Sequence, residues 1–189
     1  MATPKRPHAS SIYQLKVTLK GSKPPIWRRL QLRGDTRLSE LHDILQLAMG
    51  WGDAHLHQFT AGEQSFGRPD ADDWTEVRDE RQVVLSQVAR AEKARLGYEY
   101  DFGDSWEHQL LVEKILPPEP GKDYPVCVAG KRACPPEDVG GIWGYADFLA
   151  AIRDPEHREH KELLEWIGGA FDPEAFDLEA VNAALQRLQ

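Results

Sequence analysis

The chain has 189 residues, of which 41% are hydrophobic and 29% charged, a composition that suits one globular domain with a sizeable core and excludes an intrinsically disordered protein. No apolar run approaches the roughly 20 residues that a membrane-spanning helix needs, and the start of the chain lacks the apolar core of a signal peptide. The sequence therefore predicts a cytoplasmic protein with no membrane-embedded segment.

Charge is distributed unevenly along the chain. The net charge is -8, yet no acidic residue precedes Asp35, whereas eight basic residues do: Lys5, Arg6, Lys16, Lys20, Lys23, Arg28, Arg29 and Arg33. The remaining 15 basic residues face all 31 acidic ones, so the chain from Asp35 onward carries about -16. A basic edge on an acidic body could attract an anionic partner or nucleic acid, or it could neutralise the protein's own carboxylates.

The start of the chain reads as two strands. After a flexible lead over residues 1–11, apolar side chains alternate with polar ones through Tyr13–Lys20 and again through Ile26–Arg33. Arg28 falls on the apolar side of the second strand, so we expect it to need a carboxylate partner. The candidate partners are Asp101, Asp104 and Glu107.

A helix and a third strand follow. Apolar residues at helical spacing predict an amphipathic helix that is capped by Asp35 or Thr36 and ends at Gly50. His55–Phe59 is typical of another strand. The order strand–strand–helix–strand predicts an α+β fold with a β-grasp-like mixed sheet, on which the amphipathic helix packs.

The aromatic segment around residue 103 predicts a hairpin. Aromatic side chains alternate through Tyr98–Phe102, and aromatic or apolar ones alternate through Trp106–Val112. A three-residue loop over 103–105 would pair Phe102 with Trp106 and keep both sets on one face of the sheet. A two-residue loop would set the aromatics opposite polar residues, so we predict the three-residue loop.

The same register suggests a metal site. It brings Asp101 opposite Glu107, a like-charge pair that needs water, a basic side chain or a cation between its members. His55 and His57 lie on one face of their predicted strand, which is compatible with joint metal ligation. The candidate ligands of a divalent metal ion are His42, His55, His57, Asp101, Asp104 and His108. The alternative is that the histidines pack in the core and that Asp104 stabilises a turn.

The second half is predicted to be loop-rich and then helical. Residues 117–143 are rich in glycine and proline and contain both cysteines, which are too few for a disulfide framework and too far apart for a compact zinc knuckle. We expect reduced thiols there. Apolar stripes after residue 144 predict helices. One domain is expected over residues 1–189: the flexible lead 1–11, a sheet core 12–116, the loop 117–143 and a C-terminal helical subregion 144–189.

Several short motifs together resemble one family. They are Pro25-Ile26-Trp27-Arg28-Arg29, Leu41-His42, Gly50-Trp51, His55–Phe59, Tyr100–His108 and Cys134–Gly141. Their combination, from about Tyr13 through the final helices, is similar to the plasmid pRiA4b ORF-3-like family, some relatives of which are labelled passenger or resolvase-like proteins of an insertion element. The resemblance implies an α+β fold and a shared surface, and it supplies no catalytic residue. The sequence contains no serine- or tyrosine-recombinase constellation.

Three functions remain open. The first is an uncharacterised binding or interaction module that uses an aromatic, arginine-containing and acidic groove to hold a protein or an anionic partner. Its predicted binding residues are Trp27, Arg28, Arg29, Trp51, Asp104, Trp106, Glu137 and Asp138. The second is a metal-dependent hydrolase or nuclease, in which the metal candidates hold a divalent ion and Glu107 or Glu137 acts as a base. The spacing of these candidates matches no diagnostic motif.

The third function is accessory binding of nucleic acid by the first two strands. Lys16, Lys20, Arg29 and Arg33 would contact phosphates, and Trp27 could stack on a base. The acidic overall charge argues against strong non-specific affinity. No residue is assigned a catalytic role by the sequence, and neither a nucleophile elbow nor a phosphate-binding loop is present.

Overall fold

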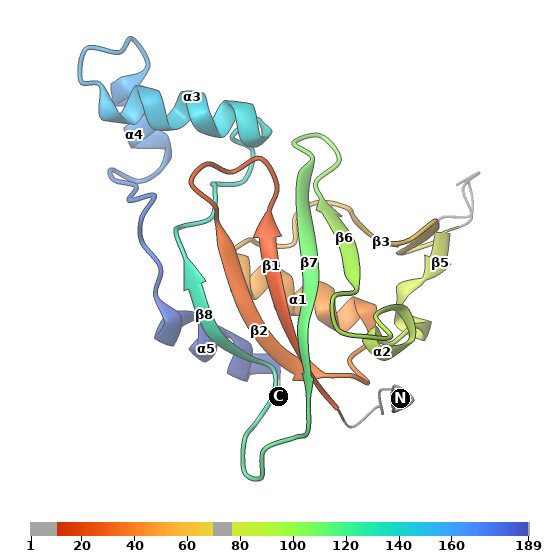
Figure 1. The fold of residues 1–189 in the computed structure, drawn as a ribbon. Coiled ribbons are helices and arrows are strands. Elements are labelled where there is room, and N and C mark those ends of the chain that lie inside the picture. Colours follow the sequence, from red (N-terminus) through yellow and green to blue (C-terminus); the bar gives the residue numbers. More distant parts are fainter. Residues whose placement is uncertain (1–10, 70–76, 189) are drawn as a thin grey trace.

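The computed structural model describes residues 11–69 and 77–188, so most of the predicted lead over residues 1–11 lies outside the described part. Eight strands form one sheet in the order β5-β4-β3-β6-β7-β1-β2-β8 (Figure 1). They are β1 (Ile12–Leu19), β2 (Trp27–Arg33), β3 (His57–Ala61), β4 (Gln64–Gly67), β5 (Val77–Asp79), β6 (Arg95–Tyr100), β7 (Trp106–Leu116) and β8 (Val126–Lys131). Neighbours are antiparallel except β4 and β5, which makes the sheet mixed.

Five helices and two short 3₁₀ turns complete the described part of the chain. They are α1 (Leu38–Met49), α2 (Leu85–Val88), α3 (Gly141–Arg153), α4 (His160–Trp166), α5 (Leu178–Leu185), η1 (Glu80–Gln82) and η2 (Gln186–Leu188). The predicted α+β class is confirmed. Within residues 11–69 and 77–188, no helix is both long enough and apolar enough to cross a membrane.

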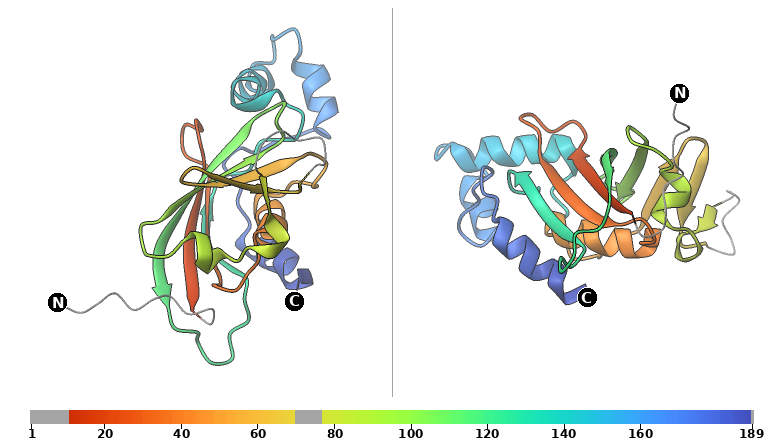
Figure 2. Two further views of the ribbon diagram at one scale, coloured as in Figure 1. Left: turned by 90° about the vertical axis from the view of Figure 1, so that its right-hand side faces the viewer. Right: turned by 60° about the horizontal axis from the view of Figure 1, so that its bottom comes forward.

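One face of the sheet is covered and the other is open. Along β1, Tyr13, Leu15 and Val17 are fully buried, whereas the residues between them are partly exposed. The helices α1 and α5 lie on the same side of the sheet, behind it in Figure 1 and seen from the side in Figure 2. The core therefore lies between the buried face and the apolar stripe of α1, to which Leu41 and Leu45 belong.

The amphipathic helix has the predicted end but a different start. Gly50 ends α1 in the left-handed conformation, at φ 94°, where glycine carries no steric cost. Asp35 and Thr36 do not cap the helix. The carboxylate of Glu40 accepts a hydrogen bond from the backbone N–H of Arg37 at 2.8 Å, and Asp35 accepts from the side chain of Arg33 instead.

The third strand lies apart from the first two in the sheet. The segment expected at His55–Phe59 forms β3, which pairs with β4 and β6. The place beside β1 is taken by β7, in antiparallel orientation, and β2 lies on the other side of β1. The sheet is thus extended on both sides of the β1–β7 pair, and two strands, β6 and β7, lie between β3 and β1.

The predicted register of the aromatic hairpin is wrong by two residues. Trp106 lies opposite Tyr100, not Phe102, and the loop spans 101–105. The larger loop leaves Phe102 in the turn with about half of its surface exposed, 51%. A shift of two residues preserves the side of the sheet on which each side chain lies, so the predicted aromatic face survives and includes His108.

The like-charge pair across this hairpin also differs from the prediction. Glu107 lies opposite Glu99, not Asp101. The amine of Lys20 lies 2.7 Å from Glu107, and the hydroxyl of Ser105 donates to Glu99 at 2.7 Å. A basic side chain and a hydroxyl thus compensate this carboxylate pair.

The C-terminal part is only partly a separate helical region. The strand β8 forms within residues 117–143, a stretch expected to be loop, so the sheet extends beyond the predicted boundary at residue 116. The helices α3 and α4 lie together beyond one end of the sheet (Figure 1). In contrast, α5 returns to the body, where Asn182 exchanges two hydrogen bonds with the backbone of Cys127 in β8, at 2.8 and 2.9 Å.

Candidate functional site

The structure distributes the six predicted metal ligands over separate places. His42 and His57 lie in a buried cluster, and His55 and Asp101 lie in a more exposed one. His108 lies in the aromatic core, and Asp104 lies in a turn. Each of the two clusters also contains residues that were not predicted as ligands. We name them the inner cluster, which is His42, Asp53, His57 and Glu80, and the outer cluster, which is His55, Asp101 and Asp138.

The inner cluster is built around two stacked imidazoles. His42 lies on the sheet-facing side of α1, and His57 begins β3. Their rings are nearly parallel, with 8° between the planes and 3.4 Å between the centroids. His42 Nε2 lies 2.7 Å from Asp53 Oδ1, and His57 Nε2 lies 2.8 Å from Glu80 Oε2. One ligand atom each of His42, Asp53 and His57 lie within 4.8 Å of one another.

A chain of hydrogen bonds fixes the tautomer of His42. The backbone N–H of Asp53 donates to Gln46 Oε1 at 3.0 Å, so the amide NH₂ of Gln46 faces the hydroxyl of Tyr98 and donates to it at 2.9 Å. That hydroxyl then donates to His42 Nδ1 at 2.8 Å. His42 therefore carries its proton on Nε2, the nitrogen that faces Asp53.

Burial keeps the two central groups of this chain uncharged. Desolvation lowers the pKa of His42, and the neighbouring ring of His57 lowers it further, although the hydrogen bond to Asp53 opposes both. Desolvation also raises the pKa of Tyr98, which stays a phenol at neutral pH. A neutral imidazole is the form of histidine that binds metal ions.

Arg68 covers the open side of the inner cluster. The side chains of His42, His57 and Glu80 are 1–3% exposed, whereas that of Asp53 is 41% exposed. The guanidinium of Arg68 lies 3.8 Å from Glu80 and 3.9 Å from Asp53, too far for hydrogen bonds. The cluster is therefore reached from solvent along Asp53 and Arg68, and within residues 11–69 and 77–188 its two carboxylates face one cationic side chain, that of Arg68.

The outer cluster is built around His55, which belongs to the same short segment, residues 53–57, as Asp53 and His57 of the inner cluster. His55 separates Asp53 from His57 in the sequence, and its ring packs edge-on against Tyr100 at 5.7 Å between centroids. His55 Nε2 lies 3.2 Å from Asp138 Oδ1 and 3.7 Å from Asp101 Oδ2. One histidine thus faces two carboxylates, one from the β6–β7 turn and one from the loop before α3.

Predicted binding residues surround the outer cluster. The hydroxyl of Tyr100 donates to Glu137 at 2.5 Å, and the other oxygen of that carboxylate accepts from the backbone of Gly52 at 3.1 Å. Burial raises the pKa of Tyr100, and the hydrogen bond to Glu137 raises it further. Asp104 accepts from the backbone N–H of Gly140 at 3.1 Å. Asp104, Glu137 and Asp138 therefore do come together.

All three aspartates of the two clusters have a left-handed backbone. Within the described residues, six non-glycine positions have positive φ, and Asp53, Asp101 and Asp138 are three of them, at 54°, 58° and 59°. Aspartate tolerates this conformation better than most residues. Non-glycine residues held at positive φ nevertheless gather at functional sites, because the surrounding structure must offset their strain.

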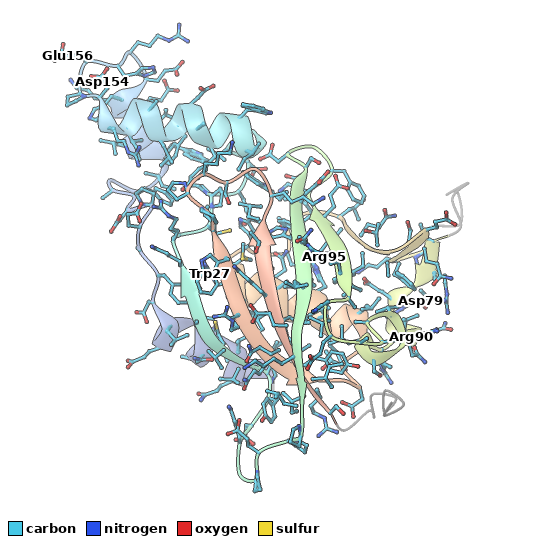
Figure 3. The ribbon with its side chains drawn as sticks, viewed as in Figure 1. Trp27, Asp79, Arg90, Arg95, Asp154 and Glu156 are labelled. Atoms are coloured by element: carbon cyan, nitrogen blue, oxygen red, sulfur yellow. The ribbon has the colours of Figure 1, made fainter. Side chains whose placement is uncertain are left out.

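The other predicted binding residues line no common surface. Trp51 and Trp106 are buried in the aromatic core, where the Trp51 indole stacks on Tyr100 at 5.1 Å. Trp27 and Arg29 lie on the open face of the sheet, as the view of Trp27 in Figure 3 shows. Arg29 forms a bidentate pair with Glu113 at 2.6 and 2.9 Å.

The carboxylate partner expected for Arg28 is absent among the described residues. Arg28 is 3% exposed, and its guanidinium donates to three backbone oxygens, those of Ala48 at 2.8 Å, Trp27 at 3.0 Å and Lys131 at 3.1 Å. Ala48 lies in the last turn of α1, where the helix dipole favours a positive charge. The ring of Phe176 covers the guanidinium at 4.6 Å. Carbonyl oxygens and an aromatic face thus replace the expected ion pair.

The basic residues proposed for nucleic acid are largely engaged within the protein. Lys20 pairs with Glu107, Arg29 with Glu113 and Arg33 with Asp35. Lys16 lies over the ring of Trp27 at 5.2 Å. These contacts neutralise most of the positive charge of β1 and β2, which weakens the case for phosphate binding on this face.

His108 packs among aromatic rings. Its side chain is 1% exposed, and Nδ1 donates to the carbonyl of Trp106 at 2.9 Å. The ring of Trp51 meets it edge-on at 5.3 Å. Complete burial lowers the pKa of His108 to about 4, so it is neutral at neutral pH. Cys127 and Cys134 are both free thiols whose pKa is raised by burial.

Sequence reasoning missed three residues of the inner cluster and its rim. Asp53 follows a turn, and Glu80 and Arg68 lie in segments without clear periodicity. One signal was available: His42 and Gln46 are polar residues one turn apart on the buried stripe of an amphipathic helix. Polar side chains in such a place must find partners, and Asp53 is a partner of both.

A groove adjoins the outer cluster. It has a volume of about 570 Å³ and lies between α3, α4 and the loop before α3. Phe148, Leu163 and Trp166 supply an apolar lining, and Asp138 of the outer cluster lies at its edge. The charged residues along it are Asp138, Asp147, Arg158, Glu159 and Glu162.

These features define an α+β protein with a one-sided mixed sheet and two neighbouring histidine–carboxylate clusters. The family model of the plasmid pRiA4b ORF-3-like protein matches residues 11–180, so the chain belongs to that family. It is 40% identical over 181 residues to the uncharacterized protein y4hQ of Sinorhizobium fredii, a match that covers 95% of this chain and 93% of the relative.

A solved structure has the same fold. The crystal structure of the protein of unknown function MM3350 from Methanosarcina mazei Go1 matches with a TM-score of 0.83 and 38% identity. The match covers 90% of this chain and 96% of that protein. The resemblance stated from the sequence is thus confirmed at the level of the family and of the fold.

Proposed function

We propose that this chain is a metalloprotein that binds one divalent transition-metal ion at the inner cluster and uses it to hydrolyse an anionic substrate. The observation that carries the proposal is the pair of buried imidazoles, each with Nε2 directed at a carboxylate. Two imidazole nitrogens and two carboxylates are a common donor set for zinc and manganese. Burial favours the neutral, metal-binding form of His42.

The charge of the inner cluster favours a cation. Asp53 and Glu80 bring two negative charges, the two histidines bring none when neutral, and Arg68 brings one positive charge. A divalent ion bound between these groups would take the Nε2 lone pair of each ring, so the proton that His42 carries on Nε2 would move to Nδ1, where the hydroxyl of Tyr98 would accept its hydrogen bond. Because each nitrogen lone pair lies in the plane of its ring, the parallel rings of His42 and His57 must tilt apart when the ion enters.

Supporting residues already have the positions that metal ligands need. Tyr98 holds His42 through Nδ1, and Gln46 holds both Tyr98 and the backbone of Asp53. Partners of this kind fix the orientation of ligating histidines and tune their basicity. These partners hold the ring of His42 and the backbone of Asp53 in place, and the proton on His42 Nε2 must move to Nδ1 before Nε2 can bind an ion.

Hydrolysis is the chemistry that fits the open side of the cluster. A bound divalent ion would act as a Lewis acid and would lower the pKa of a coordinated water molecule. Asp53 is partly exposed and is placed to accept a proton there, and Arg68 is placed to bind an anionic group of the substrate. We expect a phosphate ester as the substrate class, since its charge suits a guanidinium and a divalent ion together.

Metal titration tests the proposal. Metal-free protein is titrated calorimetrically with Zn²⁺, and His57→Ala should weaken binding at the inner cluster at least about 100-fold, more than the loss of a supporting partner costs. His108→Gln is the matched control, because it removes a buried imidazole that lies outside both clusters. Asp53→Asn offers a second, partly exposed ligand if His57→Ala folds poorly.

Two further outcomes decide between the parts of the proposal. Equal Zn²⁺ affinity in wild type and His57→Ala would overturn the metal site. Hydrolysis of bis(p-nitrophenyl) phosphate should require the added ion, should be lost in Arg68→Ala and should persist in His108→Gln. A loaded protein without this activity against phosphate esters would overturn the hydrolase and leave a metal-binding protein.

A second candidate function is the interaction module that the sequence suggested, at a different surface. The observation in its favour is the groove beside α3 and α4, where Trp166 is 49% exposed and acidic residues outnumber basic ones. Such a groove suits a cationic peptide with one large apolar side chain. A synthetic lysine-rich peptide containing a phenylalanine should quench Trp166 fluorescence, and Glu162→Lys should weaken its binding.

A further inference from the structure

The outer cluster contains a nitrogen that is buried but unpaired. His55 Nε2 is shielded from solvent, yet among the described residues it makes no hydrogen bond. Asp138 Oδ1 lies only 3.2 Å away, but not in a direction that a ring N–H can use. A buried polar atom without a partner is costly, and His55 Nε2 differs from the equally unpaired Tyr13 hydroxyl because two carboxylates lie beside it.

Two carboxylates converge on this nitrogen. Asp101 uses Oδ1 to accept from the backbone N–H of Gly103 at 2.9 Å, which leaves Oδ2 directed toward His55 at 3.7 Å. Asp138 approaches from the opposite segment, and the three ligand atoms lie within 4.8 Å of one another. One imidazole carries at most one positive charge, so it cannot neutralise two carboxylates that are this close.

The backbone around the outer cluster is held in place before any ion binds. Asp101 and Asp138 are both fixed at positive φ. The turn and the start of α3 pack so closely that a Cβ at Gly141 would collide with the carbonyl oxygen of Asp104. The hydrogen bond from Gly140 to Asp104 joins the same two segments. The ligands therefore need little rearrangement, which lowers the cost of binding.

We propose that the outer cluster is a second divalent-cation site, formed by His55, Asp101 and Asp138. One imidazole and two carboxylates, with Asp138 largely exposed, form an open site in which water would complete the coordination, and this donor set suits Mn²⁺ or Zn²⁺. The site uses no residue of the inner cluster, so it does not depend on the proposed function.

An ion at the outer cluster would join three segments of the chain. His55 lies before β3, Asp101 in the β6–β7 turn and Asp138 in the loop before α3. Binding would restrict the motion of the loop before α3, and of α3 itself, relative to the end of the sheet. Because Asp138 also lies at the edge of the groove, the open positions of the ion would be accessible to a ligand bound there.

Manganese titration followed by electron paramagnetic resonance tests this site, because the signal of free Mn²⁺ reports the number of ions bound. Wild type should bind two ions. His55→Gln and Asp138→Asn should each bind one and keep the inner site, whereas His57→Ala should keep the outer one. Asp147→Asn, which removes another carboxylate of the same groove, should still bind two.

The possible results separate the two sites. Two bound ions in both His55→Gln and Asp138→Asn would overturn the outer site. One ion in wild type that disappears in His57→Ala would overturn it as well, and the inner site would stand. One ion in wild type that disappears in His55→Gln would support the outer site alone.

Hydrogen exchange supplies a readout that does not depend on stoichiometry. Mn²⁺ should slow exchange at least several-fold over residues 132–140 in wild type, because the ion fastens this loop. Asp138→Asn should remove the effect and His57→Ala should not. The same rate with and without Mn²⁺ in wild type would contradict the fastening of the loop.

Discussion

His42 and His108 are equally buried, at 1% exposed each, but their surroundings are opposite. His42 meets a carboxylate, a phenol and a second imidazole, whereas His108 donates to a carbonyl and otherwise touches aromatic rings. Both lie on the covered side of the same sheet. Burial alone therefore does not distinguish a ligand from a core histidine; the presence of carboxylates around the ring does.

The largest expected difference between the two histidine environments is their response to metal. At about 1,000 times its dissociation constant, Zn²⁺ should raise the free energy of unfolding by about 4 kcal/mol in wild type and in His108→Gln. His57→Ala should gain no more than about 1.4 kcal/mol from the inner cluster, since a site weakened 100-fold is exposed to only about 10 times its dissociation constant. Chemical denaturation with and without Zn²⁺ measures this; an equal gain in His57→Ala would contradict the account.

The next difference is in pH dependence. Burial lowers the pKa of His108 from 6.5 to about 4 in the folded protein. Between these two values the unfolded chain binds a proton that the folded protein does not, so stability falls as the pH falls. The loss should reach roughly 3 kcal/mol for His108. The lowered pKa of His42 acts in the same direction.

Denaturation of metal-free protein at several pH values measures this dependence. His108→Gln should flatten the curve between pH 6.5 and 4 but leave the part that His42 contributes. An unchanged slope in His108→Gln would show that His108 titrates normally in the folded protein.

Two buried tyrosines sharpen the comparison further. The hydroxyl of Tyr98 bonds to His42 and Gln46, whereas the hydroxyl of Tyr13, also buried, has no partner among the described residues. Tyr98→Phe should cost about 1–3 kcal/mol, because it leaves two buried groups unpaired. Tyr13→Phe should cost little or even stabilise. Equal effects in a denaturation experiment would contradict the hydrogen-bond chain.

The smallest effect is expected on the open face of the sheet. The side chains of Lys20 and Glu107 are about half exposed, so their ion pair is screened by water and salt. Lys20→Met should lower the free energy of unfolding by less than about 1 kcal/mol, and this loss should be smaller at high salt. A loss above 2 kcal/mol would mean that the pairing of Glu99 with Glu107 depends on Lys20 more than the exposure suggests.

The sequence predicted those parts of the fold that depend on local pattern. The alternation of apolar and polar residues predicted β1 and β2, and apolar residues at helical spacing before Gly50 predicted α1. The every-second-residue spacing of aromatic side chains predicted the aromatic face that includes Trp106 and His108. The register failed because the loop length depends on the conformation of Asp101, which has φ 58°, and one sequence does not reveal that choice. The neighbours of β3 depend on contacts between distant segments.

The candidate site was predictable only in part, for the same reason. His42 and His57 were recognised as candidates by their residue type and position, but Glu80 comes from a 3₁₀ turn whose place the sequence does not indicate. Arg28 shows the opposite error, because a buried arginine was expected to need a carboxylate and found three carbonyl oxygens. Local pattern indicates which groups are buried, and only the fold indicates what they meet.

The most direct measurement is anomalous diffraction at the zinc absorption edge from crystals of the Zn²⁺-loaded protein. We expect a peak between His42 Nε2 and His57 Nε2, next to Asp53 and Glu80, with the two rings tilted from their parallel stack. A well-loaded crystal with no peak at this position, and with the rings still stacked 3.4 Å apart, would contradict it.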